Sequence, residues 1–95
     1  MNLELAEEDF ERLWFEPEFD MALPVGVVKA YRKRLWVMWN AGDERDLYLV
    51  GSWQTKKLDN GQYQMRLNDQ YRIRFEIIKD EDDKRIRITE VGDPH

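Results

Sequence analysis

Two arginines in the middle of the chain and two residues at its C-terminal end carry side chains suited to phosphoryl chemistry. The arginines are Arg66 and Arg72, and the terminal pair is Asp93 and His95, which is the single histidine of the sequence. Guanidinium groups bind phosphate oxygens through paired hydrogen bonds and stabilise transition-state charge. An imidazole titrates near neutral pH, so it can donate or accept a proton. These groups predict cleavage of RNA by its own 2′-hydroxyl, with no metal and no cofactor.

Three segments alternate apolar and polar residues, and this alternation brings the four side chains together. The segments cover residues 62–67, 70–77 and 85–89. A period of two predicts antiparallel strands that each bury one face. Because the apolar residues take one face, the arginines of these strands must project from the other.

A hairpin loop fixes how the last two strands pair. A four-residue loop at 80–83 places Glu76 opposite Arg87 and Arg72 opposite Val91. In this register apolar residues face apolar residues, and a carboxylate faces a guanidinium group.

The preceding hairpin brings the two central arginines side by side. A three-residue loop at 68–70 places Arg66 directly opposite Arg72, on the face that no helix covers. Odd-numbered residues of the last strand share that face if the chain stays extended. Three more side chains are then expected there: Val91, Asp93 and His95.

Two helices are expected before the sheet. Residues 6–15 have apolar side chains at helical spacing and carboxylates in the first turn, where the helix dipole favours them. Residues 25–42 predict the main helix, with Gly42 as its C-cap. One stripe of this helix is expected to be buried: Val28, Tyr31, Leu35, Met38 and Trp39.

The remaining segments complete an α+β fold in a single domain over residues 1–95. Residues 2–5 and 46–51 are candidate strands, and the tryptophans are interpreted as core residues. The predicted architecture has two N-terminal helices on one face of a small twisted, mainly antiparallel sheet. With 95 residues, of which 42% are hydrophobic, the chain is long enough for one core.

Charge is distributed unevenly along the chain. The formal net charge is −5. Residues 1–20 hold eight carboxylates and one arginine, a sum of −7, so the rest of the chain sums to +2. An acidic total is unusual for a nucleic-acid-binding protein, but the local field decides what binds at a surface.

Three features of the sequence bear on location. There is no cysteine, which suits a reducing compartment. No apolar run is long enough to span a bilayer. The N-terminus lacks the basic and then apolar pattern of a secretory signal. We therefore expect a cytoplasmic protein with no membrane partner.

Simpler interpretations stay open for each motif. Strand arginines that face solvent usually serve solubility, and a C-terminal histidine is often part of a frayed end. Lys56 and Lys57 are typical of solvated lysines. The basic segment at 29–34 more often marks a solvated helix face than a nucleic-acid patch.

Several short motifs together resemble the HigB branch of the RelE/ParE toxin superfamily, the plasmid maintenance killer type. They include "LP" at 23–24, "RL" at 34–35, "KL" at 57–58, "GQY" at 61–63, "RLNDQYRIRF" at 66–75 and the ending "DPH" at 93–95. The "NDQYRI" block followed by the terminal histidine is the most specific part of this pattern.

The resemblance implies the toxin of a type II toxin–antitoxin system, acting as a ribosome-dependent mRNA endoribonuclease. His95 would be the general acid on the leaving 5′-oxygen, and Asp93 would orient it. Arg72 and Arg66 would stabilise the charge that develops on the phosphate. Five further cations would contact phosphates: Lys56, Lys57, Arg74, Arg85 and Arg87.

The implied partners are the ribosome, mRNA and a helix-turn-helix antitoxin of the HigA type. Operator DNA would be reached through the antitoxin alone.

Two other functions are compatible with the same fold, because a fold does not fix an activity. ParE-like relatives inhibit DNA gyrase without cutting nucleic acid. An inactive homologue would serve only as the partner that helps an antitoxin bind its operator. Pro94, where the family usually has an aromatic residue, and the acidic first 20 residues favour this last alternative.

Overall fold

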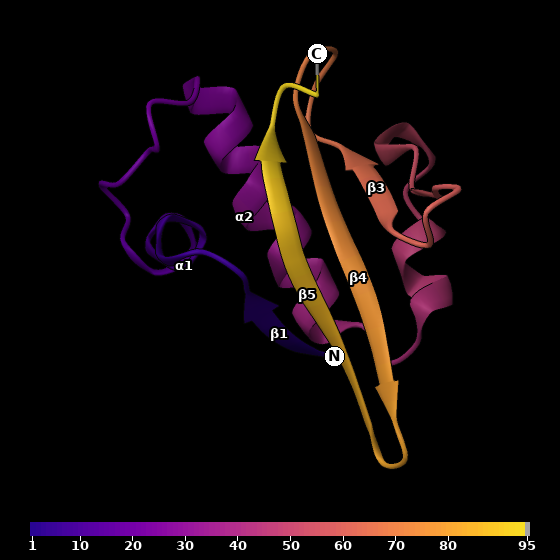
Figure 1. The fold of residues 1–95 in the computed structure, drawn as a ribbon. Helices are drawn as coiled ribbons and strands as arrows, with labels where there is room; N and C mark the ends of the chain where they lie inside the picture. The colour runs from indigo at the N-terminus through magenta and orange to yellow at the C-terminus, as the bar shows by residue number, and fades with distance from the viewer. Residues whose placement is uncertain (95) are drawn as a thin grey trace.

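A five-stranded sheet forms the centre of the computed structural model, which describes residues 1–94 (Figure 1). The strands are β1 (Asn2–Leu5), β2 (Lys56–Lys57), β3 (Tyr63–Arg66), β4 (Arg72–Asp80) and β5 (Asp83–Gly92). Their order across the sheet is β1-β5-β4-β3-β2. β1 runs parallel to β5, and the other neighbours are antiparallel. The sheet is therefore mainly antiparallel, as predicted.

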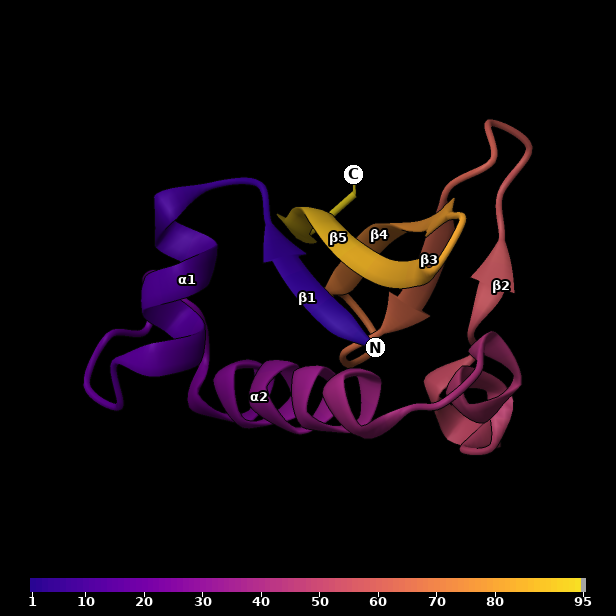
Figure 2. The same cartoon turned by 90° about the horizontal axis from the view of Figure 1, so that it is seen from below.

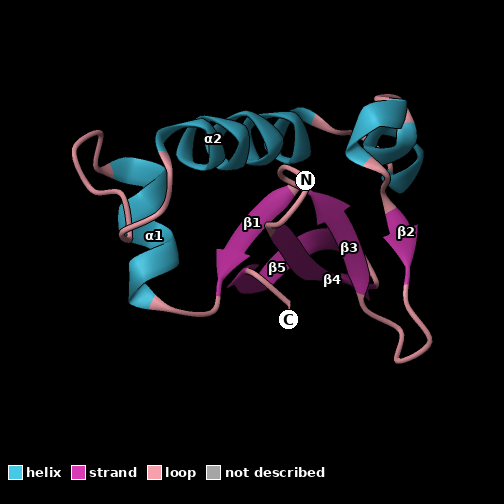
Figure 3. Ribbon diagram, turned by 90° about the horizontal axis from the view of Figure 1, so that it is seen from above, coloured by secondary structure: helices cyan, strands magenta, loops and turns pink. Residues whose placement is uncertain are grey.

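Two α-helices pack against this sheet, which confirms the α+β class. They are α1 (Glu8–Phe15) and α2 (Val25–Asn40). α2 runs across one face of the sheet, and α1 stands beside the β1 edge (Figures 2 and 3). Within residues 1–94 the opposite face carries no helix, so the polar side chains of β3, β4 and β5 are open to solvent there. No helix in this part of the chain has the length and hydrophobicity needed to cross a bilayer.

The core lies between α2 and the covered face of the sheet. Five strand residues are fully buried in it: Met65, Ile73, Phe75, Ile86 and Ile88. From α2 the main contributors are Tyr31, Leu35 and Met38, which are also fully buried. The Tyr31 hydroxyl donates a hydrogen bond of 2.9 Å to the carbonyl of Phe10 and so ties α1 to α2.

The predicted register holds over most of the two hairpins. Glu76 lies opposite Arg87, and Arg66 lies opposite Arg72. The β4–β5 turn contains only residues 81–82, because Asp80 and Asp83 still pair.

The predicted register is wrong beyond Ile88. A straight ladder would place Glu90 opposite the buried Ile73, leaving a carboxylate in the core. Instead the ladder shifts between Arg74 and Phe75, so that Glu90 lies opposite Arg74. This β-bulge removes the carboxylate from the core.

The bulge has a side-chain partner and changes the face of the following residues. The Thr89 hydroxyl donates to the Arg74 carbonyl at 3.3 Å, where the ladder is interrupted. Val91 lies opposite Ile73 and packs against the core, so its predicted place beside the arginines is wrong. Arg72 pairs with Gly92 instead of Val91.

The predicted strand at 46–51 is also wrong, because this region forms two 3-10 helices, η1 (Glu44–Tyr48) and η2 (Gly51–Trp53). The Asp43 carboxylate accepts a hydrogen bond of 2.9 Å from the backbone N–H of Arg45, which caps the first turn of η1.

The C-terminal half of α2 differs from its prediction. The helix ends at Asn40, and Ala41 is its C-cap in place of Gly42. The side chain of Trp39 is 58% exposed and that of Trp36 is 57% exposed, whereas Trp53 is buried. Four residues of the predicted stripe, Val28, Tyr31, Leu35 and Met38, are buried, and the predicted burial of Trp39 is wrong.

Candidate active site

Arg66 and Arg72 lie at the end of the β3–β4 hairpin, opposite each other on the open face of the sheet. Like charges directly opposite one another destabilise a sheet by roughly 0.2–1 kcal/mol. Each arginine therefore needs a compensating partner. Arg66 finds one in Asp69, with which it forms an ion pair within the hairpin loop.

Arg72 is held by backbone carbonyls of the same loop. Its Nη1 donates to the carbonyls of Asn68 and Tyr71, the latter at 3.0 Å, and its Nη2 donates to the carbonyl of Asp69 at 3.3 Å. The loop is itself closed by the Asn68 side chain, which accepts from the backbone N–H groups of Gln70 and Tyr71 at 2.8 and 2.7 Å. These contacts fix the guanidinium group of Arg72 without neutralising its charge.

The Arg72 guanidinium keeps donors for a ligand. Of its five N–H groups, the contacts recorded among residues 1–94 use both on Nη1 and one on Nη2. The Nε–H and the second Nη2–H are left. Guanidinium N–H groups of this kind donate strong hydrogen bonds to phosphate oxygens.

A buried arginine supports the hairpin from the helix layer. Arg34 of α2 is only 9% exposed, and its Nε and Nη2 donate to the Arg66 carbonyl at 3.3 and 3.2 Å. Its guanidinium carbon lies 4.3 Å from the centroid of the Trp53 ring. Burial lowers the pKa of Arg34 from its usual value. Arg34 therefore joins α2, η2 and the end of β3 behind the candidate site.

The C-terminal tail is attached to the same hairpin loop. The Asp93 carboxylate accepts a hydrogen bond of 2.9 Å from the side-chain amide of Gln70. Gly92 has a φ of 155°, a backbone conformation that residues other than glycine rarely adopt. After it, the tail turns toward the side of the sheet opposite α2 (Figures 2 and 3). His95 lies outside the described residues, so its predicted role stays a prediction.

The other strand arginines are paired with carboxylates of the protein itself. Arg74 lies 3.3 Å from Glu90. Arg85 contacts Glu4 at 2.9 Å and Asp80 at 2.7 Å, and these hydrogen bonds raise its pKa. The predicted partner of Arg87 was Glu76, but its ion pair is with Glu4, at 3.4 Å.

The two lysines of β2 lie at the other edge of the sheet. Lys56 pairs with Gln64, which faces Arg74, so it belongs to the open face. Lys57 pairs with Tyr63, and its ammonium nitrogen lies 5.8 Å from the centre of that ring. Because neighbouring strand residues point to opposite faces, the two lysines do not share one surface.

Comparison with known proteins concerns the fold. No family model and no curated protein matches the sequence. The structure is similar to that of a YoeB/ParE toxin from Agrobacterium tumefaciens, with a TM-score of 0.61 over 100% of both chains and 11% sequence identity. The chain has a RelE/ParE-like fold. At this identity the likeness extends to the fold alone, and the HigB resemblance stays a prediction.

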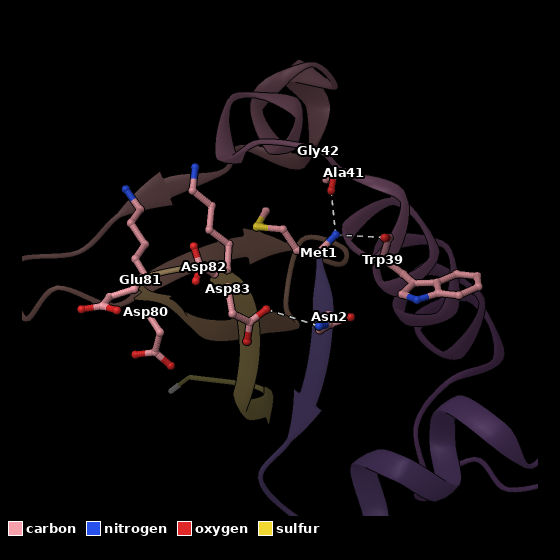
Figure 4. A pocket seen from close by; sticks show the side chains of 11 residues that line it. Met1, Asn2, Trp39, Ala41, Gly42, Asp80, Glu81, Asp82 and Asp83 are labelled. Carbon is pink, nitrogen blue, oxygen red and sulfur yellow. Dashed lines mark hydrogen bonds between the residues drawn. The ribbon is translucent and has the colours of Figure 1, made fainter.

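A cavity of about 540 Å³ lies at the opposite end of the RelE/ParE-like sheet, between the chain start, the end of α2 and the β4–β5 turn (Figure 4). Here the ammonium group of Met1 donates to the carbonyls of Met38, Trp39 and Ala41, at 3.1, 2.9 and 2.6 Å. A nine-residue strand separates this cavity from Arg72, a distance of roughly 25 Å. This cavity is therefore not part of the candidate active site around Arg66 and Arg72.

The sequence interpretation missed two residues that shape the site. Gln70 holds Asp93, and Arg34 holds the Arg66 carbonyl. Arg34 had a signal, since it lies three residues after Tyr31 and four before Met38, which places it on the buried stripe. Gln70 had none, because its contact depends on where the tail turns.

Proposed function

We propose that this protein is the toxin of a type II toxin–antitoxin system and that it cleaves mRNA on translating ribosomes. One observation carries the proposal. At a single end of the open face, Arg66 lies opposite Arg72, and the loop between them holds Asp93 through Gln70. The RelE/ParE-like fold supports the same conclusion.

In the proposed reaction the 2′-hydroxyl of RNA gives its proton to solvent water, its oxygen attacks the adjacent phosphorus, and the bond from phosphorus to the 5′-oxygen breaks. His95 donates a proton to the departing 5′-oxygen, and Asp93 orients the imidazole. The guanidinium groups of Arg72 and Arg66 stabilise the charge on the phosphate oxygens. The products are a 2′,3′-cyclic phosphate and a free 5′-hydroxyl.

The remaining cations are proposed to contact the RNA backbone on either side of the scissile bond. They are Lys56, Arg74, Arg85 and Arg87; Lys57, which was also expected to contact phosphates, pairs with Tyr63 on the other face and is not part of this surface. The three arginines would exchange their carboxylate partners for phosphates, a change that costs little at exposed ion pairs. The protein would act in the cytoplasm and would be held inactive by a helix-turn-helix antitoxin of the HigA type.

A reconstituted translation reaction with a single defined mRNA tests this proposal. We expect the wild-type protein to cut mRNA only on the ribosome and to leave a cyclic phosphate on the upstream fragment. His95→Ala should abolish cleavage while the variant keeps its circular dichroism spectrum. Cleavage retained by His95→Ala would refute the assigned acid.

Inhibition of DNA gyrase is a second candidate function. Two observations favour it: the similar solved structure is named YoeB/ParE toxin, and Arg74, Arg85 and Arg87 are already paired with carboxylates. A DNA supercoiling assay separates the two functions, because an mRNA endonuclease leaves gyrase activity unchanged. An inactive homologue would change neither readout and would not arrest growth when overproduced.

A further inference from the structure

A groove lined mainly by aromatic side chains lies between β1, α1 and the end of α2, away from the arginine pair. Its volume is about 580 Å³, and Asn2, Leu3, Trp14, Phe15 and Trp39 line it. Phe15 is 72% exposed and Trp39 is 58% exposed. Large aromatic side chains that stay open to water in this way commonly mark a binding surface.

The groove runs beside an unpaired sheet edge. Among the described residues β1 pairs with β5 alone, so the backbone groups on its outer edge have no strand partner. Figure 4 shows the Trp39 indole projecting away from the strands, at the end of α2 nearest to β1. A segment that entered the groove would therefore meet aromatic rings and the free edge of β1.

The electrostatic environment of the groove is acidic. Glu8, Asp9 and Glu11 lie exposed on α1. Glu11 is one helical turn from Phe15, which lines the groove. Arg12, the basic residue of this helix, is paired with Glu16 at 2.6 Å. The field at the groove therefore attracts cations and repels phosphates.

We propose that this groove binds a basic segment of a partner protein, with aliphatic side chains against Trp39 and Phe15 and lysines or arginines against Glu8 and Glu11. A nucleic acid or an anionic membrane would be repelled by α1. A second copy in a twofold interface would bring the same carboxylates against each other, because such an interface pairs a patch with itself. This inference does not depend on the proposed nuclease activity.

The test uses two labelled 12-residue peptides, one of alternating leucine and lysine and one with glutamate in place of each lysine. Binding to the full chain is followed by fluorescence anisotropy at low and at physiological salt. We expect the lysine peptide to bind at least about tenfold more tightly than the glutamate peptide. Trp39→Ala should weaken binding about tenfold or more, as for a central aromatic residue of an interface.

Two matched controls locate the effect. Trp36→Ala removes an equally exposed tryptophan of α2 that does not line the groove, and it should leave binding unchanged. Glu8→Lys with Glu11→Lys should weaken binding, whereas Glu81→Lys with Asp82→Lys makes the same charge change at the β4–β5 turn and should not.

Four results would overturn the proposal. Neither peptide binds, or the two peptides bind equally tightly. A groove variant and its control lose the same amount of peptide affinity. Sedimentation shows that the protein self-associates and that Trp39→Ala removes this self-association. The nuclease assay reads out a different face of the molecule. Either proposal can therefore fail while the other stands.

Discussion

Glu4 on β1 holds two of the arginines that we propose contact RNA, so it offers a way to test them. It contacts Arg85 at 2.9 Å and Arg87 at 3.4 Å. Glu4→Gln removes one negative charge and keeps almost the same side-chain shape. The Arg87 guanidinium group should then be more available to phosphates, whereas Arg85 keeps its contact with Asp80 at 2.7 Å.

The structure sets the size of this effect. The side chains of Arg87 and Glu4 are 40% and 46% exposed, so their ion pair contributes no more than about 1 kcal/mol. That amount corresponds to about fivefold in RNA affinity per released arginine. One added phosphate contact should also steepen the slope of log K against log salt by about 0.7, the value per contact for single strands.

Fluorescence anisotropy of a labelled single-stranded RNA, measured between about 50 and 200 mM salt, gives both quantities. Glu81→Gln is the matched control, because Glu81 is exposed in the β4–β5 turn and the charge change is the same. We expect tighter binding and a steeper slope for Glu4→Gln alone. Equal changes in the two variants, or no change in either, would show that Arg87 does not contact phosphates.

Three further predictions concern the helix contact and the tail. Tyr31→Phe should lower the free energy of unfolding by about 1–3 kcal/mol in urea denaturation, because it leaves the buried Phe10 carbonyl without its donor. Burial raises the pKa of Tyr31 above its usual value near 10. The neutral Tyr31 hydroxyl therefore stabilises the folded state fully below about pH 10, and this stabilisation is lost as the pH rises further. The urea midpoints measured at about pH 9 and about pH 11 should differ less for Tyr31→Phe than for the wild type. Gly92→Ala should reduce mRNA cleavage while the circular dichroism spectrum is kept, because alanine is strained at a φ of 155°.

The strand register could be predicted because it depends on local patterns. Loop length and alternation place Arg66 opposite Arg72 and Glu76 opposite Arg87, and both pairs form. The bulge at Thr89 also had a signal, since a straight ladder would have placed Glu90 opposite Ile73. Had the mismatch of Glu90 with Ile73 been taken as the sign of a bulge, the prediction would have placed Val91 opposite Ile73, in the core.

Other features depend on how elements pack, and the sequence does not reveal them. The exposure of Trp39 follows from where the short α1 stands, beside the β1 edge and not over the end of α2. The first 3-10 helix after α2, η1, is capped by Asp43, in a segment whose apolar residues suggested a strand. The hydrogen bond from Gln70 to Asp93 depends on the turn of the tail at Gly92.

The central claim is that Arg72, fixed by the carbonyls of its loop, stabilises the phosphate during mRNA cleavage. Mapping mRNA 5′ ends in cells after induction of the wild type and of Arg72→Lys tests it most directly, because lysine keeps the charge and loses the paired donors. The account predicts new ends within coding regions for the wild type and about a hundredfold fewer for Arg72→Lys, with equal protein levels. Equal numbers of ends in the two strains would contradict it.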